Sequence, residues 1–415
     1  MSYRRSHRSA SKSHTRLACA SQKIIALREK AKASTAAFLA RRQRQIAWWQ
    51  RAFRTPLVGF YGWVRSQCNS ACSALMMLLG LVAKPQLLAR STSSRHSHYH
   101  RRQSTRRRLR TESLEARALL ATVSDGGGTT LTISLATDED LAVVSNGTTY
   151  SFSSDMNFTK GVVANVGDFS AFGGTSLTLE ASGLARYNTV SVVDSGTNST
   201  VTFSNSGGNK YADQFTVLLA NASAGAITFN GATAFDGSNS LSASTTKNIV
   251  VSSGSSVSTV GGNLTLEANQ QSTPTTASFV GINVYNATVN STGSGNVLLK
   301  GRGGDTGTEN HGVQVLLGGF VSGGGTVTVE GTGGASTGAA NFGVQVTDTN
   351  STITSSAGAV LVKGLGGGSG GSSGSNHGVI MVQGGVIRSN GTGAGATVTV
   401  EGTGGNTGST NNNGV

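Results

Sequence analysis

The larger, C-terminal part of this sequence lacks the residues that cross-link a fold or interrupt a strand. The whole chain of 415 residues holds 3 Cys, 3 Trp and 3 Pro, and after residue 120 only Pro274 remains of these. The lack of Cys excludes disulfides as a source of stability in that part. Because Pro cannot donate to a β-ladder, its scarcity favours a chain whose backbone amides nearly all pair between strands.

Acidic residues are scarce at one end of the chain, and basic residues are scarce at the other. Residues 1–120 hold 25 Lys and Arg but 3 Asp and Glu, a net charge of +22, whereas residues 121–415 hold 8 basic and 16 acidic residues, a net charge of −8. Glycine is concentrated in the second part, which holds 55 of the 58 Gly. The overall charge of +14 therefore describes neither part, and alone it does not predict nucleic-acid binding.

The last third of the chain contains four near-copies of one segment: VLLKGRGG from 297, VTVEGTGG from 327, VLVKGLGG from 360 and VTVEGTGG from 398. Their starts are 30, 33 and 38 residues apart, and a second segment (NHGVQV, NFGVQV, NHGVIM, NNGV) follows in step. Periods of this length mark repeat proteins, in which one unit buries its apolar face only by stacking on its neighbours.

One repeat, 326–357, predicts three short strands. TVTVEG, FGVQVTD and STITSS alternate at period 2, and the Gly-rich stretch GTGGASTGAA is expected to be a loop after the first strand. Three strands with their turns match one coil of a right-handed parallel β-helix, so we predict an all-β solenoid of roughly nine coils at about 33 residues each. An array of antiparallel β-sandwich repeats is the alternative, and it would pair strands within a repeat instead of between repeats.

Stacked coils place equivalent residues in columns, and the fourth position of the first strand alternates in charge. The residues of this column are Glu267, Lys300, Glu330, Lys363 and Glu401. Opposite charges on neighbouring strands contribute roughly 0.2–1 kcal/mol a pair, so the alternation predicts a stabilising ladder. Tandem duplication of a two-coil unit would give the same pattern without selection for charge.

A second column is predicted at one turn, where side-chain amides would bond along the axis: Asn310, Asn341, Asn376 and Asn412. The residues after them are His311, Phe342, His377 and Asn413. Two His on alternate coils would stand about 10 Å apart, too far to share a metal ion. We therefore expect these His to pack within loops and predict no metal or other cofactor.

The N-terminal 120 residues predict a leader. Residues 21–55 are rich in helix formers and basic side chains, which indicates a partly amphipathic helix that can touch an anionic membrane surface. ALMMLLGLVA at 74–83 is too short to span a bilayer and is typical of the apolar region of a signal peptide.

Residues 106–121, RRRLRTESLEARALLA, resemble the LEPR-XLL motif found near the N-terminus of many large surface proteins of bacteria, planctomycetes in particular. Leu114, Glu115, Arg117, Leu119 and Leu120 match the motif, and Ala116 takes the place of the usual Pro. Residues 225–269 also resemble the haemagglutinin-type β-helix of bacterial surface proteins in composition and rhythm. These resemblances imply export to the cell surface or the medium, and they imply no activity.

The expected organisation is a basic leader over 1–105, an export motif over 106–121, irregular coils over 122–260 and regular coils over 261–415. No C-terminal cap is visible in the sequence, so we expect the coils to continue past residue 415. The predicted function is that of an exported structural or adhesive protein, with glycans or neighbouring surface proteins as partners and no specific nucleic acid.

Two other classes stay open. A polysaccharide-active β-helix enzyme would need two or three converging carboxylates, whereas this chain offers about one acid per coil. Binding to a membrane or to nucleic acid through the basic N-terminus would use the Arg-rich run at 101–110.

Overall fold

The computed structural model describes residues 120–415, apart from 195, 205, 221–224, 370–373 and 406–410. The chain divides into two units, Met1–Arg108 and Leu109–Val415, and every described residue belongs to the second. The leader at 1–105 lies outside the described residues, as do Leu114, Glu115, Arg117 and Leu119 of the expected export motif.

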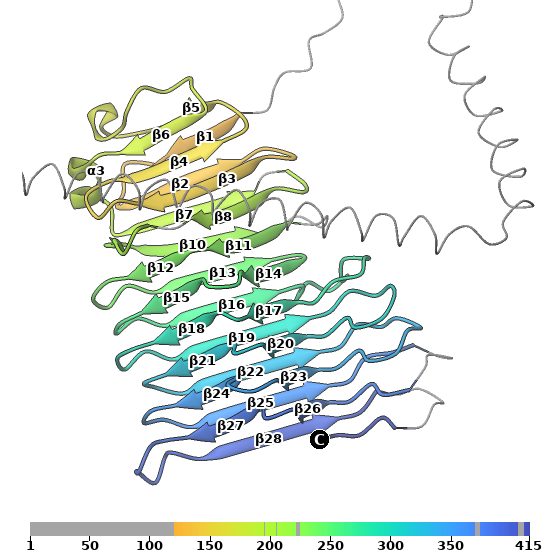
Figure 1. The fold of residues 1–415 in the computed structure, drawn as a ribbon. Coiled ribbons are helices and arrows are strands. Elements are labelled where there is room, and N and C mark those ends of the chain that lie inside the picture. The colour runs from red at the N-terminus through yellow and green to blue at the C-terminus, as the bar shows by residue number, and fades with distance from the viewer. Residues whose placement is uncertain (1–119, 195, 205, 221–224, 370–373, 406–410) are drawn as a thin grey trace, which may run out of the picture. The chain divides into compact units, whose positions relative to one another are not determined.

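Three long sheets run side by side along a stack of coils (Figure 1). Nine of the 11 strands of sheet A pair in parallel along the stack: β2 (Thr130–Leu135), β7 (Thr189–Asp194), β10 (Gln214–Leu219), β13 (Leu241–Thr245), β16 (Leu264–Ala268), β19 (Val297–Arg302), β22 (Val327–Thr332), β25 (Val360–Leu365) and β28 (Val398–Thr403). Eight of the 10 strands of sheet B do the same: β3 (Asp140–Ser145), β8 (Thr200–Ser204), β11 (Ala226–Asn230), β14 (Asn248–Val251), β17 (Ile282–Tyr285), β20 (Val313–Leu316), β23 (Val344–Thr347) and β26 (Val379–Val382).

Sheet C contains seven strands: β9 (Lys210–Tyr211), β12 (Ala232–Phe235), β15 (Ser256–Thr259), β18 (Thr288–Ser291), β21 (Phe320–Gly323), β24 (Thr352–Ser355) and β27 (Val386–Ser389). Each coil takes one strand from each sheet in turn, so β7 to β27 form seven complete coils. Every pairing among them is parallel and joins one coil to the next, as in β19 with β22 and β22 with β25. The parallel β-helix is confirmed, and the antiparallel sandwich array is wrong for these coils.

The interior of the coils is filled by alternate residues of all three sheets. Strand β22 shows the rule: Val327 and Val329 are fully buried, whereas Thr328 and Glu330 face outward and are partly exposed. The first complete coils enclose aromatic rings, with Phe203 stacked on Phe229 at 5.1 Å and Tyr211 on Phe235 at 5.1 Å between ring centroids. Later coils enclose mainly Val, Leu and Ile, which pack closely without rings between the sheets.

The N-terminal end of the stack differs from the irregular coils expected over 122–260. Strand β1 (Ala121–Ser124) pairs antiparallel with β2, β4 (Tyr150–Ser154) pairs antiparallel with β3, and β6 (Ser176–Leu179) pairs antiparallel with β4. Strand β5 (Phe158–Lys160) adds to β1, and the one-turn helix η1 (Val166–Asp168) and helix α3 (Ala181–Arg186) complete the segment. Residues 121–187 thus act as a cap, which leaves seven complete coils instead of nine.

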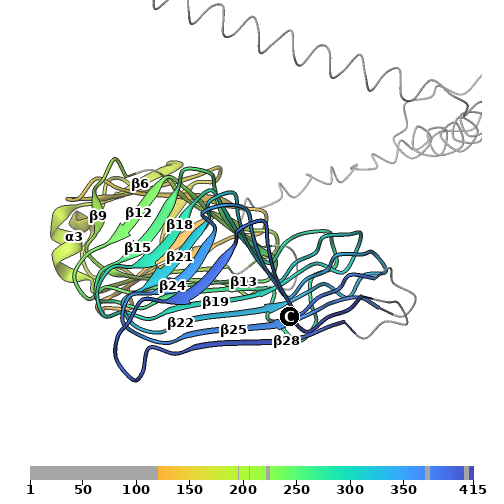
Figure 2. The same cartoon turned by 60° about the horizontal axis from the view of Figure 1, so that its bottom comes forward.

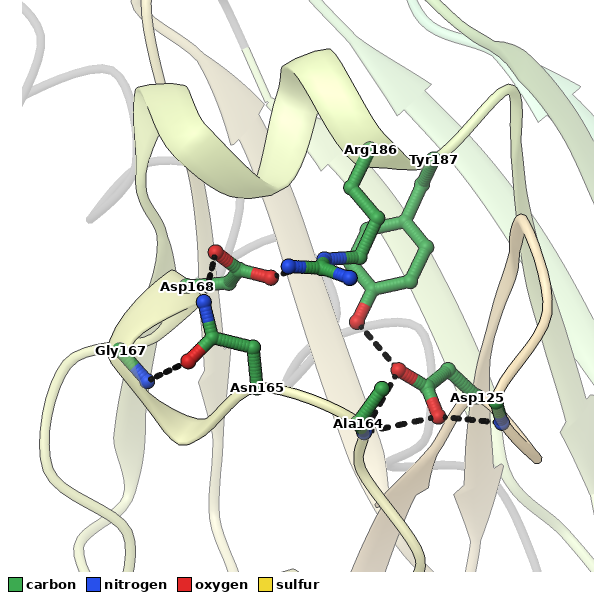
Figure 3. Close-up of polar contacts among 8 residues, drawn as sticks. Asp125, Ala164, Asn165, Gly167, Asp168, Arg186 and Tyr187 are labelled. Carbon is green, nitrogen blue, oxygen red and sulfur yellow. Dashed lines mark hydrogen bonds and ion pairs between the residues drawn. The ribbon is translucent and has the colours of Figure 1, made fainter.

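A polar network holds the cap together (Figure 3). The buried Asp168 carboxylate accepts a hydrogen bond of 2.5 Å from Arg186 Nε and one of 3.0 Å from Asn165 Nδ2. The Asp125 carboxylate accepts from the Tyr187 hydroxyl at 2.8 Å and from the backbone of Ala164. Burial raises the pKa of Asp125, but a hydrogen bond from Gly127 N, the bonds from Ala164 and Tyr187, and the charge of Arg186 together outweigh burial and hold the pKa below its ordinary value. Capping covers the open sheet edges that a bare end coil would expose.

Five segments project together beyond the core, which we name the arm: the described residues of 269–281, 303–312, 333–343, 366–378 and 404–414. Figure 2 shows the arm beside the coils, on the side toward which β19, β22, β25 and β28 run. Backbone hydrogen bonds of 2.7–2.8 Å join its successive layers, from Gly334 N to Asn310 O and from Gly367 N to Asn341 O. The stretch that the sequence predicted to be a plain Gly-rich loop is therefore an ordered, stacked layer.

In the coils from β19 onward, the interior narrows to a glycine seam where the chain enters the arm. The inward positions of β22 and the residues after it read Val327, Val329, Gly331 and Gly333. A Cβ atom at Gly331 would collide with the carbonyl oxygen of Gly343, and one at Gly333 with that of Asn341. Only glycine allows two backbones to approach this closely, so sheets A and B press together here without side chains between them.

Candidate functional site

The predicted charged column lies on the outward face of sheet A. Glu267 is the Cα partner of Lys300, Lys300 of Glu330, Glu330 of Lys363, and Lys363 of Glu401. The parallel register therefore brings all five residues into one line along the stack, with alternating charge.

Two ion pairs form within this column. Lys300 Nζ lies 3.6 Å from a Glu330 carboxylate oxygen, and Lys363 Nζ lies 3.3 Å from one of Glu401. The four side chains are 36–58% exposed, so each pair contributes little to stability, of the order of 0.2–1 kcal/mol. Long, half-exposed pairs of this kind keep donors and acceptors that solvent or a ligand can use.

A second column runs beside the charged one, two positions further along each strand. It consists of Arg302, Thr332, Leu365 and Thr403, which are Cα partners from coil to coil. Leu365 is 47% exposed, an unusual position for a large apolar side chain on an otherwise polar face. In each of these strands a glycine of the seam lies between the two columns, as Gly331 does between Glu330 and Thr332.

Two adjoining cavities follow these columns and together form what we name the groove. One has a volume of about 330 Å³ and is lined by Lys300, Glu330, Lys363, Glu401, Leu365 and Thr403, among others. The second, of about 420 Å³, is lined by Arg302, Asp305, Pro274 and residues of the arm. Thr332 lines both cavities. The groove therefore runs from sheet A onto the foot of the arm.

The predicted asparagine column lies inside the arm and holds its layers in register. Asn310 N donates to Asn341 Oδ1 at 3.1 Å, Asn341 N to Asn376 Oδ1 at 2.9 Å, and Asn376 N to Asn412 Oδ1 at 2.9 Å. The side-chain amides of Asn310 and Asn341 also donate to carbonyls of their own layers, at Thr306 and Gly338. Asn310, Asn341 and Asn376 are fully buried. These residues support the groove from behind and do not line it.

A ring stack follows the asparagines. His311 lies on Phe342 at 4.8 Å and Phe342 on His377 at 5.4 Å between ring centroids. The Nδ1 atom of buried His311 accepts from Phe342 N at 3.3 Å, and burial lowers the pKa of His311 to about 4. The intervening Phe342 separates the two imidazoles, so the structure uses both His in packing.

The sequence interpretation missed two features of this region. The first is the glycine seam, whose signal was the period-2 alternation of β22 continuing through Gly331 and Gly333. The second is a further asparagine pair just before strands β16 and β19, where Asn296 N donates to Asn263 Oδ1 at 2.9 Å. From the sequence, Gly333 is expected in a loop, whereas the inward positions of the strand continue through this glycine.

The groove offers donors and acceptors but no cluster of metal ligands. Among the residues that the structure describes, no group of three or more His, Cys, Asp or Glu is placed to hold a metal ion. Within the same residues, no helix is both long and apolar enough to cross a membrane. No family model, curated protein or solved structure matches this chain.

Proposed function

We propose that this chain is an exported structural or adhesive protein, whose coils present a repeated polar surface outside the cell or at the cell surface. The observation that carries the proposal is the alternating column from Glu267 to Glu401, which repeats one chemistry along the stack without concentrating it at one point. Such a surface suits many weak contacts that act together, with glycans or neighbouring surface proteins as partners.

Catalysis is not part of the proposal. Glycoside hydrolysis needs two carboxylates with different protonation states that flank one bond. In the described column, the carboxylates of Glu330 and Glu401 each lie beside a lysine ammonium, and their strands are two coils apart. Carboxylates arranged in this way are suited to hydrogen bonding with a ligand. They are not paired on one bond as acid–base catalysis would need.

The export part of the proposal rests on the sequence. A basic leader with an apolar run at 74–83 precedes the LEPR-XLL-like segment, and β1 of the cap begins at Ala121, the last residue of that segment. Membrane contact of the leader would then be transient.

Cell fractionation with intact-mass analysis of the natural protein tests the proposal. We expect a form in the medium or on the surface that begins near Thr122. A full-length form that stays in the cytoplasm, bound to nucleic acid or to the inner membrane, would contradict it and would make the basic leader the functional part.

A further inference from the structure

The groove along the two columns carries no net charge. Lys300, Lys363 and Arg302 are balanced by Glu330, Glu401 and Asp305 among its lining residues. Opposite charges alternate from coil to coil at about 4.8 Å, so their fields cancel within a short distance. A polyanion would be repelled by a carboxylate on every second coil. A polycation would be repelled by an ammonium or guanidinium group on the coils between. The groove is therefore selective against both kinds of charged polymer.

A ligand rich in hydroxyl groups matches this alternation. A hydroxyl both donates and accepts, so it can donate to Glu330 on one coil and accept from Lys363 on the next. Hydrogen bonds to charged groups are stronger than those between two neutral groups. The long ion pairs of 3.3–3.6 Å leave these groups with unused bonding capacity.

The floor of the groove suits a flat ring. Gly301, Gly331, Gly364 and Gly402 line the cavity on sheet A, and Leu365 and Pro274 add apolar surface. A pyranose ring has C–H faces that pack on apolar surface and hydroxyls at its rim. Each ring in an extended glycan adds a length close to the spacing between successive coils. No aromatic side chain belongs to the described lining of the two cavities, so each contact is weak and affinity comes from several coils acting together.

An extended peptide fits this groove less well. Peptide strands are usually bound by an open sheet edge, but β19, β22 and β25 have both edges paired within the stack. Side chains on one face of a peptide strand recur about every 6.6 Å, which does not match a coil spacing of about 4.8 Å.

We propose that the groove binds one extended, uncharged polysaccharide along the stack axis, with one sugar ring per coil from β19 to β28. The site deepens the proposed adhesive function by assigning it a ligand class and a place.

Binding to the full-length protein by calorimetry and by NMR tests the proposal with three neutral hexasaccharides: cellohexaose, maltohexaose and mannohexaose. Hexagalacturonate and a chitosan hexamer serve as the charged counterparts. We expect at least one neutral probe to bind in the millimolar range, and both charged probes to bind at least fivefold more weakly. Binding by none of the neutral probes, or tighter binding of a charged probe, would overturn the proposal.

Matched variants locate the site. The double variant Glu330→Ala with Lys363→Ala keeps the net charge and removes both central polar groups, and we expect at least fivefold weaker binding. The control, Lys210→Ala with Asp236→Ala, removes an exposed ion pair of 3.1 Å away from the groove and should bind as the unaltered protein does. Equal loss in both double variants would place binding elsewhere and overturn the proposal.

Thr332→Gln provides a second test if the double variant fails to fold, because it lengthens an uncharged side chain where the two cavities meet. It should weaken binding at least threefold, and unchanged binding would overturn the site. These measurements are independent of export: a cytoplasmic protein that binds cellohexaose refutes the proposed location alone, and a surface protein that binds none of the probes refutes the groove alone.

Discussion

Asp213 is a buried carboxylate with an incomplete set of partners. It is 4% exposed, and its Oδ2 atom has no hydrogen-bond partner among the described residues. Burial raises the pKa of Asp213 to about 6, although a hydrogen bond with the Tyr150 hydroxyl acts in the opposite direction. The native protein thus holds a proton at Asp213 at acidities where the unfolded chain, with an ordinary carboxyl pKa near 3.8, has lost it.

Replacement of Asp213 by Asn should stabilise the protein at neutral pH. A native pKa above the unfolded value means that Asp213 favours folding below about pH 4, and that this contribution falls as pH rises to about 6. Above pH 6 the ionised carboxylate costs about 1–3 kcal/mol. We expect Asp213→Asn to raise the free energy of unfolding at pH 7.5 by that amount and to leave it nearly unchanged at pH 4, as chemical denaturation would measure. Equal effects at the two pH values would contradict the assignment.

His311 should make the protein less stable in acid. Its pKa is about 4 in the folded chain and about 6.5 in an unfolded one, so the unfolded chain takes up a proton first as pH falls. The free energy of unfolding should be highest above pH 6.5 on this account and should fall by about 2–3 kcal/mol between pH 6.5 and 4. An NMR titration of the His311 imidazole checks the cause, and a midpoint near 6.5 would refute it.

At the scale of the element, the repeated V-x-V-x-G-x-G pattern builds a strand that begins in a hydrophobic core and ends in a backbone seam. Large inward side chains hold sheets A and B apart, and inward glycines let them meet. The same pattern repeats in β25 and β28, and in β19 with Leu299 at the second inward position, so the seam continues from β19 to β28. The asparagine column then satisfies buried backbone amides that would otherwise lack partners.

Gly331→Ala should disrupt this element. Its added Cβ would collide with the Gly343 carbonyl oxygen and press on a methyl group of Val344, so we expect a loss of about 2–4 kcal/mol in unfolding free energy. Gly393→Ala is the matched control, since nothing lies within 4 Å of the added atom, and it should change stability by less than about 0.5 kcal/mol. Similar melting temperatures for the two variants would argue against the seam.

At the scale of the molecule, the described unit is a one-dimensional stack in which each coil contacts its neighbours. Stability of such a stack is approximately the sum of coil terms and interface terms. A change at one coil therefore acts through the two interfaces beside it. The cap of 121–187 joins the first complete coil through parallel pairing of β2 with β7 and of β3 with β8. Within the cap, antiparallel strands and the Asp168 and Asp125 networks close the end of the stack.

Lys363→Glu tests the stacking of charges. The change would put an acidic residue between Glu330 and Glu401, so that three acids follow one another in the column. We therefore expect the melting temperature to fall, with a loss of about 0.5–1 kcal/mol in unfolding free energy at low salt. Added salt should reduce the loss because the side chains are partly exposed. The double variant with Glu401→Lys should recover about half of the loss, because it restores an opposite charge on one side while Glu330 stays on the other. No change in melting temperature at low salt would count against the column.

The sequence by itself determined the solenoid, its three strands per coil and the register of the columns, because period-2 alternation and a repeat of 30–38 residues leave few ways to bury the valines. Tertiary structure decided the cap, since antiparallel and parallel pairing of β1 to β6 use the same alternating pattern. It also decided the arm and the groove. Whether a glycine forms a loop or a seam depends on which backbone approaches it, and that neighbour, Gly343 for Gly331, lies in a different strand-forming segment of the chain.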